Sequence, residues 1–153
     1  MLYAITPEYF VQQIQCPREA KQECLPTVRQ LAELAFAARQ QGILKMDDMI
    51  QNHTRYPDPF LRKAVSLVVE NSNAESIRTV LYNYILSTKH TANYQFLNEV
   101  IIAETMLAVS RSEDTEYIFN YLVPSYFGIE YESMVVNVYR NYKQQLLHEQ
   151  ENS

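Results

Sequence analysis

The chain has 153 residues, of which 47% are hydrophobic and 20% are charged, and its formal net charge is −5 at pH 7. This length and balance fit one globular domain that buries about 70% of its unfolded surface. Nucleic acid is not expected as a partner, because no Lys or Arg cluster is present to track phosphates. Two glycines and six prolines supply few of the turns that β-sandwiches and β-barrels need, so we expect an all-α fold.

No segment predicts a membrane span or a targeting signal. The longest uncharged stretch, residues 117–129, is shorter than the ~20 residues of a spanning helix. The first ten residues lack the basic and apolar regions of a signal peptide. Cys16 and Cys24 have the spacing of neither a CxxC redox pair nor a metal knuckle, so they are expected to be small buried residues. We therefore expect a cytoplasmic protein with reduced thiols and no direct membrane insertion.

Three helices are predicted in the first third of the chain. A proline in the first turn favours a short helix over residues 7–15, and Pro17 ends it or begins a connector. The clearest amphipathic pattern runs from residue 26 to Gly42, which can adopt the left-handed conformation that ends helices. A short helix over 45–52 follows, with Asp47 near its positively polarised start. Gly42 therefore marks a corner between two helices.

The middle of the chain predicts a helical hairpin. Asp58 stands before a proline, as an N-cap residue does, and an apolar stripe follows it. Asn71 can end this helix, and Ser72 or Asn73 can cap a second helix that reaches about residue 89. Because the link is so short, we expect the two helices to lie antiparallel.

The last third of the chain predicts three more helices. Residues 93–109 are apolar on more than one side, which favours a central position. Ser110, three residues before Glu113, resembles a capping box for a helix that reaches Pro124. The final helix, about 130–150, has one apolar face formed by Tyr131, Met134, Val135, Val138, Tyr142 and Leu146. The whole chain, 1–153, is thus predicted to be a single helical domain, a compact bundle of about seven or eight helices.

Motifs for catalysis, metals and cofactors are absent from the sequence. His53, His90 and His148 are far apart and show no metal-ligand spacing. Two glycines cannot build a phosphate-binding loop, and no nucleophile motif occurs. Glu99 and Glu104 lie on different faces of their helix, which favours surface or interhelical roles. We expect no catalytic site, metal or cofactor; an enzyme would require His90, Glu99 or Glu104 to converge in a deep pocket.

Two segments together resemble a known family. LPTVRQLAELAFAARQQGILKMDDMI, residues 25–50, resembles the cytoplasmic segment of the flagellar stator A subunit (MotA/PomA family), where a helix ends in A-R-x-x-G-L-L-x-L-E. DPFLRKAVSLVVENSNAESIRTVL, residues 58–81, is similar to the next element of that family, D-P-F-L-R-K-G followed by L-V-V-D-G. The resemblance covers about residues 25–90 and leaves 91–153 as a helical extension of unknown relation.

The resemblance implies a role for two charged residues. Stator A subunits engage charged residues of the rotor switch-complex protein through an arginine and a glutamate, which correspond here to Arg39 and Asp47. The aspartate is one methylene shorter than the family's glutamate. Both residues also lie where their charge complements a helix dipole, so a purely structural role is the alternative, and the two roles are compatible. Because the family's four transmembrane helices have no counterpart here, we expect that this chain does not conduct ions.

Three functions are therefore compared. The first is a non-catalytic, soluble, stator-A-like protein of a bacterial motility system that contacts the rotor switch-complex protein or stator subunits through Arg39 and Asp47. The second is a helical scaffold that uses another surface, such as its tyrosine-bearing last helix, to form a homo-oligomer or bind another protein. The third, a minor alternative, is an enzyme. The first is the primary prediction.

Overall fold

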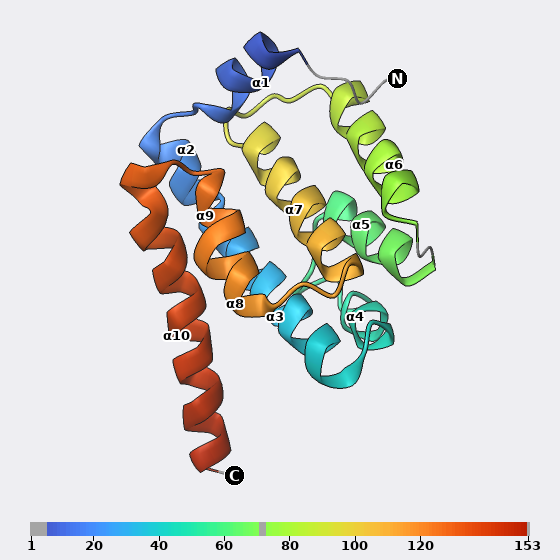
Figure 1. Ribbon diagram of the computed structural model, residues 1–153, viewed down its shortest axis with the longest axis vertical. Coiled ribbons are helices and arrows are strands. Elements are labelled where there is room, and N and C mark those ends of the chain that lie inside the picture. The colour runs from blue at the N-terminus through green and yellow to red at the C-terminus, as the bar shows by residue number, and fades with distance from the viewer. Residues whose placement is uncertain (1–5, 71–72, 153) are drawn as a thin grey trace.

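The computed structural model describes residues 6–70 and 73–152. Every regular element in this part of the chain is helical, which confirms the all-α prediction. Eight helices have six or more residues and pack into a compact bundle. One of them, α7, runs through the middle, with α6 on one side and α10 on the other (Figure 1).

The N-terminal third follows the sequence pattern with one addition. Helix α1 spans Pro7–Ile14, α3 spans Leu25–Gln41 and α4 spans Leu44–Met49, close to the predicted bounds. The addition is α2, Arg18–Glu23, which occupies part of the region that was predicted as a connector. This helix was missed because six residues are too few to show a helical period.

The predicted helix pair in the middle of the chain is present. Helix α5 spans Pro59–Glu70, and the Asp58 carboxylate accepts the Phe60 N–H at 2.9 Å, so the predicted N-cap is confirmed. Helix α6 spans Ala74–Ser87. Its N-cap is Asn73, whose side-chain oxygen accepts two backbone N–H groups at 3.0 and 3.2 Å. The predicted helix end at 71 and the alternative cap at 72 lie outside the described residues. Helices α5 and α6 contact each other, and both pack against α7.

Helix α7, Gln95–Ser110, is the core of the bundle, as its sequence predicts. Thirteen of its 16 residues are buried. It contacts α1, α3, α5, α6 and α9, which are distributed around it. A helix that is apolar on more than one side can bury each apolar face only where neighbours surround it, so its burial follows from its composition.

The predicted capping box after α7 is wrong. Ser110 is the last residue of α7, and its hydroxyl donates to the Leu107 carbonyl at 2.6 Å. The next helical segment begins at Thr115, where the side chain of Asp114 accepts the Glu116 N–H at 2.9 Å. It continues as α8 (Thr115–Tyr117), the π-helical turn η1 (Ile118–Leu122) and α9 (Val123–Ser125). The wide turn precedes Pro124, which lacks the N–H that an α-helical bond would need.

The chain ends in the short 3₁₀ turn η2, Ile129–Tyr131, and the long helix α10, Glu132–Glu151. Helix α10 packs along α3 and extends beyond the rest of the bundle at its C-terminal end (Figure 1). Tyr139 stacks on Phe119 with ring centroids 5.0 Å apart, and Tyr142 meets Phe36 edge to face at 6.0 Å. These tyrosines are turned into the protein, so they do not form the free surface that the scaffold hypothesis suggested for the last helix.

Candidate interaction surface

Arg39 and Asp47 lie on either side of the turn between α3 and α4, called here the α3–α4 corner, residues 39–48. Gly42 makes the turn with φ 94° and ψ 161°, and its N–H donates to the Ala38 carbonyl at 2.9 Å. The positive φ agrees with the sequence prediction, whereas the ψ value lies outside the left-handed helical region. Such a conformation is almost restricted to glycine, which explains why the break falls at this residue.

Arg39 is exposed in the last turn of α3, yet part of its side chain is engaged within the protein. Its Nη1 donates to the backbone carbonyl of Ser112 at 3.3 Å. Ser112 has φ 58°, the one left-handed non-glycine residue of the described chain. Its N–H donates to Val109 and the N–H of Glu113 donates to Ala108, both at 3.0 Å. This is a Schellman ending of α7 with serine in the usual glycine position. Arg39 therefore stabilises, through its hydrogen bond, a turn in which serine adopts a strained left-handed conformation.

Asp47 is half-buried in the first turn of α4. Its backbone carbonyl accepts the Gln51 side-chain amide at 3.1 Å. No ion pair involves its carboxylate in the described part of the chain, and the neighbouring carboxylate of Asp48 pairs with Lys45 at 3.4 Å. Arg39 and Asp47 thus share one corner without neutralising each other, and each keeps charge that another molecule could meet.

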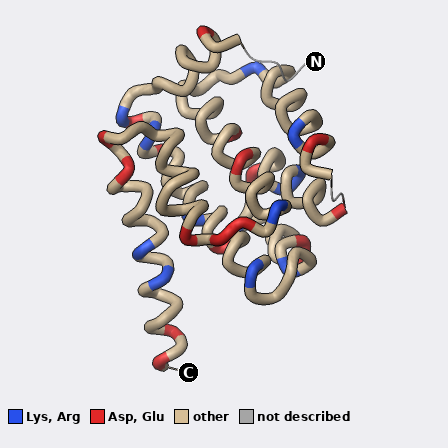
Figure 2. Tube along the Cα trace, viewed as in Figure 1, with Lys and Arg blue, Asp and Glu red and all other residues tan. Residues whose placement is uncertain are grey.

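The corner has a small pocket and a mixed electrostatic character. The pocket, of about 160 Å³, lies between the end of α3 and the α7–α8 link, with Arg39 and Ser112 in its lining. Ligand pockets usually measure about 300–1,000 Å³, so this one has room for little more than one side chain of a partner. Figure 2 shows a run of acidic residues at the α7–α8 link, which contains Glu113 and Asp114 and is followed by Glu116 in α8. A partner would meet a cation beside several carboxylates.

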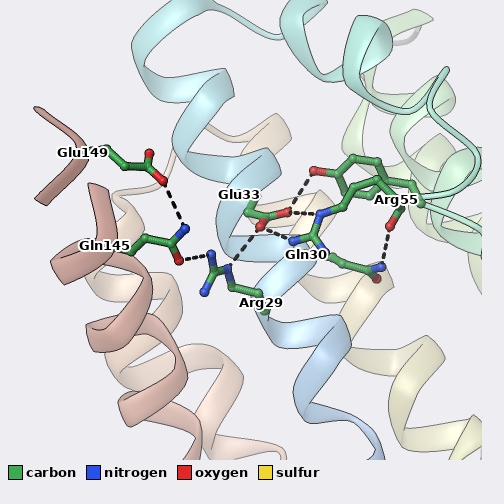
Figure 3. Close-up of polar contacts among 7 residues, drawn as sticks. Arg29, Gln30, Glu33, Arg55, Gln145 and Glu149 are labelled. Carbon is green, nitrogen blue, oxygen red and sulfur yellow. Dashed lines mark hydrogen bonds and ion pairs between the residues drawn. The ribbon is translucent and has the colours of Figure 1, made fainter. Parts of the chain in front are cut away.

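Helix α3 is held in place by a polar network around Glu33, whose side chain is only 13% exposed (Figure 3). The carboxylate accepts hydrogen bonds from the Arg29 Nε at 3.1 Å, the Arg55 Nε at 3.1 Å and the Tyr56 hydroxyl at 3.0 Å. A second Arg55 nitrogen also pairs with it. On the other side, Arg29 donates to Gln145 of α10 at 2.6 Å. The network joins α3 to the α4–α5 loop and to α10.

The electrostatic effects within this network are mutual. Burial, and then the negative charge of Glu33, raise the pKa of the Tyr56 hydroxyl, so tyrosine remains a hydrogen-bond donor at neutral pH. The hydrogen bond with Glu33 raises the pKa of the Arg55 guanidinium. Local sequence patterns do not predict this cluster, because its members come from separate elements. The only local signal was the i, i+4 spacing of Arg29 and Glu33.

The groups that an enzyme would require are separated into two pairs. His90 Nε2 and Glu99 Oε1 lie 2.9 Å apart, whereas Glu104 forms an ion pair with Arg78 of α6 at 3.0 Å. The interhelical role that the sequence predicted for Glu104 is therefore confirmed. Burial raises the pKa of the Glu99 carboxyl, against the opposing effect of His90. The pairs lie on different sides of α7 and do not converge in one pocket.

The cysteines show no sign of activation. Cys16 and Cys24 are both free and buried, as predicted. Burial raises the pKa of the Cys24 thiol to about 12, which leaves almost no nucleophilic thiolate at neutral pH. Within the described residues, no group of three or more His, Cys, Asp or Glu side chains is arranged to hold a metal ion.

Comparison with known proteins gives one partial likeness. Over 55 residues the chain is 38% identical to Motility protein A of Borreliella burgdorferi, and the match covers 36% of this chain. The chain spans about 20% of the length of that relative. No protein-family model and no solved structure matches the chain. No helix in the described part of the chain combines the length and apolar character needed to cross a bilayer. The likeness to Motility protein A is thus distant and partial.

Proposed function

We propose that this chain is a non-catalytic, stator-A-like protein of a bacterial flagellar motility system that binds a charged component of the rotor or stator through the α3–α4 corner. Arg39 and Asp47 would carry the contact. The observation that carries the proposal is the partial likeness to Motility protein A, together with the stator-like sequence pattern at this corner. Arg39 is exposed and Asp47 has no ion pair among the described residues, so both have charge to offer.

Such a contact is expected to be weak and reversible. Exposed ion pairs contribute about 0 to 1 kcal/mol each and are screened by salt. Charges at the rim of an interface mainly affect the association rate and the choice of partner. A protein of a motor that must engage and release its partner repeatedly would benefit from such a contact.

The proposal is tested by calorimetric titration of the protein with the charged C-terminal domain of the rotor switch protein from the same organism, at low and moderate salt. We expect binding that weakens with salt and is weakened by Arg39→Glu. Lys63→Glu, a charge reversal at an exposed position on α5, is the matched control and should bind as the wild type does. No binding at low salt would contradict the rotor contact.

Arg39 also stabilises the turn at Ser112 through a hydrogen bond, so reversal of its charge could weaken binding through a structural effect alone. The combination of Arg39→Glu with Ser112→Gly separates the two effects, because glycine relieves the turn without restoring the positive charge. If binding is weakened in both variants although thermal unfolding is normal in the double variant, the charge itself contributes to binding. Recovery of binding in the double variant would assign Arg39 a structural role only.

A substitution at Asp47 tests whether binding can be preserved or strengthened. Asp47→Glu restores the side-chain length of the family pattern, and we expect binding equal to or tighter than that of the wild type. Asp47→Asn should weaken binding and reduce its salt dependence, because it removes one charge from the contact. Unchanged salt dependence in Asp47→Asn would exclude this residue from the interface.

A further inference from the structure

A second surface lies where α1, α2 and the α9–α10 link meet, far from the α3–α4 corner (Figure 1). It consists of two hollows that both adjoin Ile129, a residue that is 86% exposed. The larger hollow, of about 540 Å³, is lined mainly by apolar and aromatic residues, among them Phe10, Ile14, Tyr126 and Tyr131. The smaller, of about 220 Å³, lies beside Tyr121. We call this the Ile129 surface.

The larger hollow also contains a buried positive charge. Lys21 is only 9% exposed. Its Nζ donates to the Phe127 carbonyl at 2.7 Å and lies 4.2 Å from the centre of the Tyr131 ring. No carboxylate forms an ion pair with it in the described part of the chain, although Glu130 is on the rim of the same hollow. An ammonium group has three donors, so Lys21 keeps capacity for a further acceptor.

A buried charge without a counter-ion is unfavourable, and a carboxylate supplied by another molecule would compensate it. The hollow is therefore suited to a ligand that carries an acidic group next to apolar groups. The Lys21 ammonium group lies over the Tyr131 ring, so the positive charge is in a depression that is lined mainly by apolar and aromatic residues.

The shape favours a segment of protein over a small molecule. The two hollows share Ser125, Gly128 and Ile129, so the apolar surface continues over the Ile129 ridge. Tyr121, at 70% exposed, lines the smaller hollow. Contiguous exposed apolar side chains mark sites of protein contact. Neighbouring depressions at such sites receive successive side chains of the partner.

We propose that the Ile129 surface binds an apolar segment of a partner protein and that an aspartate or glutamate of this segment pairs with Lys21. Apolar side chains of the segment occupy the two hollows that adjoin Ile129. This surface is independent of the rotor contact proposed above, because it uses none of the same residues. The protein would then have two binding faces of different chemistry.

The experiment uses a set of short helix-forming peptides in which two apolar residues flank an aspartate, a glutamate, an asparagine or a glutamine. Binding to the full chain is measured by fluorescence anisotropy. We expect the acidic peptides to bind about tenfold more tightly than their amide counterparts, and this ratio to fall to about one in Lys21→Met. Lys63→Met is the matched control and should keep the preference.

A second variant tests the apolar part of the contact. Ile129→Ser should weaken the acidic and the amide peptides alike, whereas Leu147→Ser, at an exposed apolar position of α10, should have no effect. Three results would overturn the proposal. They are a lack of binding by every peptide at millimolar concentration, a carboxylate preference that persists in Lys21→Met, and a homodimer in sedimentation equilibrium that Ile129→Ser dissociates.

Discussion

The α3–α4 corner and the Ile129 surface begin from the same backbone geometry. Gly42 has φ 94° and ψ 161°, and Gly128 has φ 97° and ψ 155°. These are the only two glycines in the chain; Gly42 is the C-cap of α3, and Gly128 directly precedes η2 in the link between α9 and α10. The side chains near them differ, since Arg39 and Asp47 lie on either side of Gly42, whereas Gly128 lies between Phe127 and Ile129. The same glycine backbone conformation thus occurs at a charged surface and at a mainly apolar one.

The two surfaces also differ in how they are held. The corner depends on polar contacts, namely the Glu33 network in the middle of α3 and the hydrogen bond from Arg39 to Ser112. The Ile129 surface rests on aromatic packing around a single buried lysine. A polar contact adds little net stability, although leaving its buried partners unpaired is costly, whereas apolar packing stabilises in proportion to buried area. Salt and pH should therefore affect the corner first.

The largest expected effect comes from removing the polar support of α3. Glu33→Ala leaves Arg29, Arg55 and the Tyr56 hydroxyl without their shared acceptor, and we expect a loss of about 2–3 kcal/mol in the free energy of unfolding, measured with urea. Glu33→Gln, which keeps one acceptor, should lose less. A loss below about 0.5 kcal/mol would show that the network behaves as a surface ion pair does.

The shared backbone geometry is tested by Gly42→Ala and Gly128→Ala. Each should lower the free energy of unfolding by about 1–3 kcal/mol, because alanine is strained at this φ. The two losses should be similar, since an added Cβ meets nothing within 4 Å at Gly42 and only Lys21 Nζ at 3.9 Å at Gly128. If urea unfolding shows no loss of stability at one of the two sites, the backbone at that site relaxes around the alanine. The two glycines would then not play equivalent roles.

A smaller change in the opposite direction is expected at the end of α7. Ser112→Gly should raise the free energy of unfolding by up to about 1 kcal/mol, because glycine adopts the left-handed conformation without steric cost. The same change should make the protein less sensitive to loss of the Arg39 hydrogen bond. If instead Ser112→Gly is destabilising, the gain in chain entropy on unfolding outweighs the strain at this turn.

The smallest effect concerns pH. The hydrogen bond from Lys143, at 2.8 Å, is the main cause that lowers the pKa of the Glu116 carboxyl, and Tyr139 adds to it. Because the folded-state pKa is below the unfolded value of about 4.3, the stabilisation is present above that pH and is lost as pH falls through the folded-state pKa. Urea unfolding should show wild type more stable than Glu116→Gln at neutral pH, with the difference shrinking below about pH 4. Glu151→Gln is the control, and a difference that does not change with pH would contradict the ion pair.

Most helices were predictable because their signals are local. Apolar periodicity placed α3, α7 and α10, and the caps at Asp58 and Asn73 formed as their residue types suggest. The end of α7 was not predictable in this way. Its left-handed residue is a serine, and a pattern that expects glycine there cannot find the turn. The same failure led to the wrong cap at Ser110.

The sequence by itself determined the all-α class, most helix positions and the corner at Gly42, because these depend on residues within one or two turns of each other. Only the tertiary structure decided which charges remain available and which are engaged. It joined Glu33 to Arg55, Arg39 to the Ser112 carbonyl and Lys21 to the Phe127 carbonyl. Such contacts join residues far apart along the chain, and no periodic pattern encodes them. A charge can be predicted from its residue type, but its burial and its partner depend on how the helices pack.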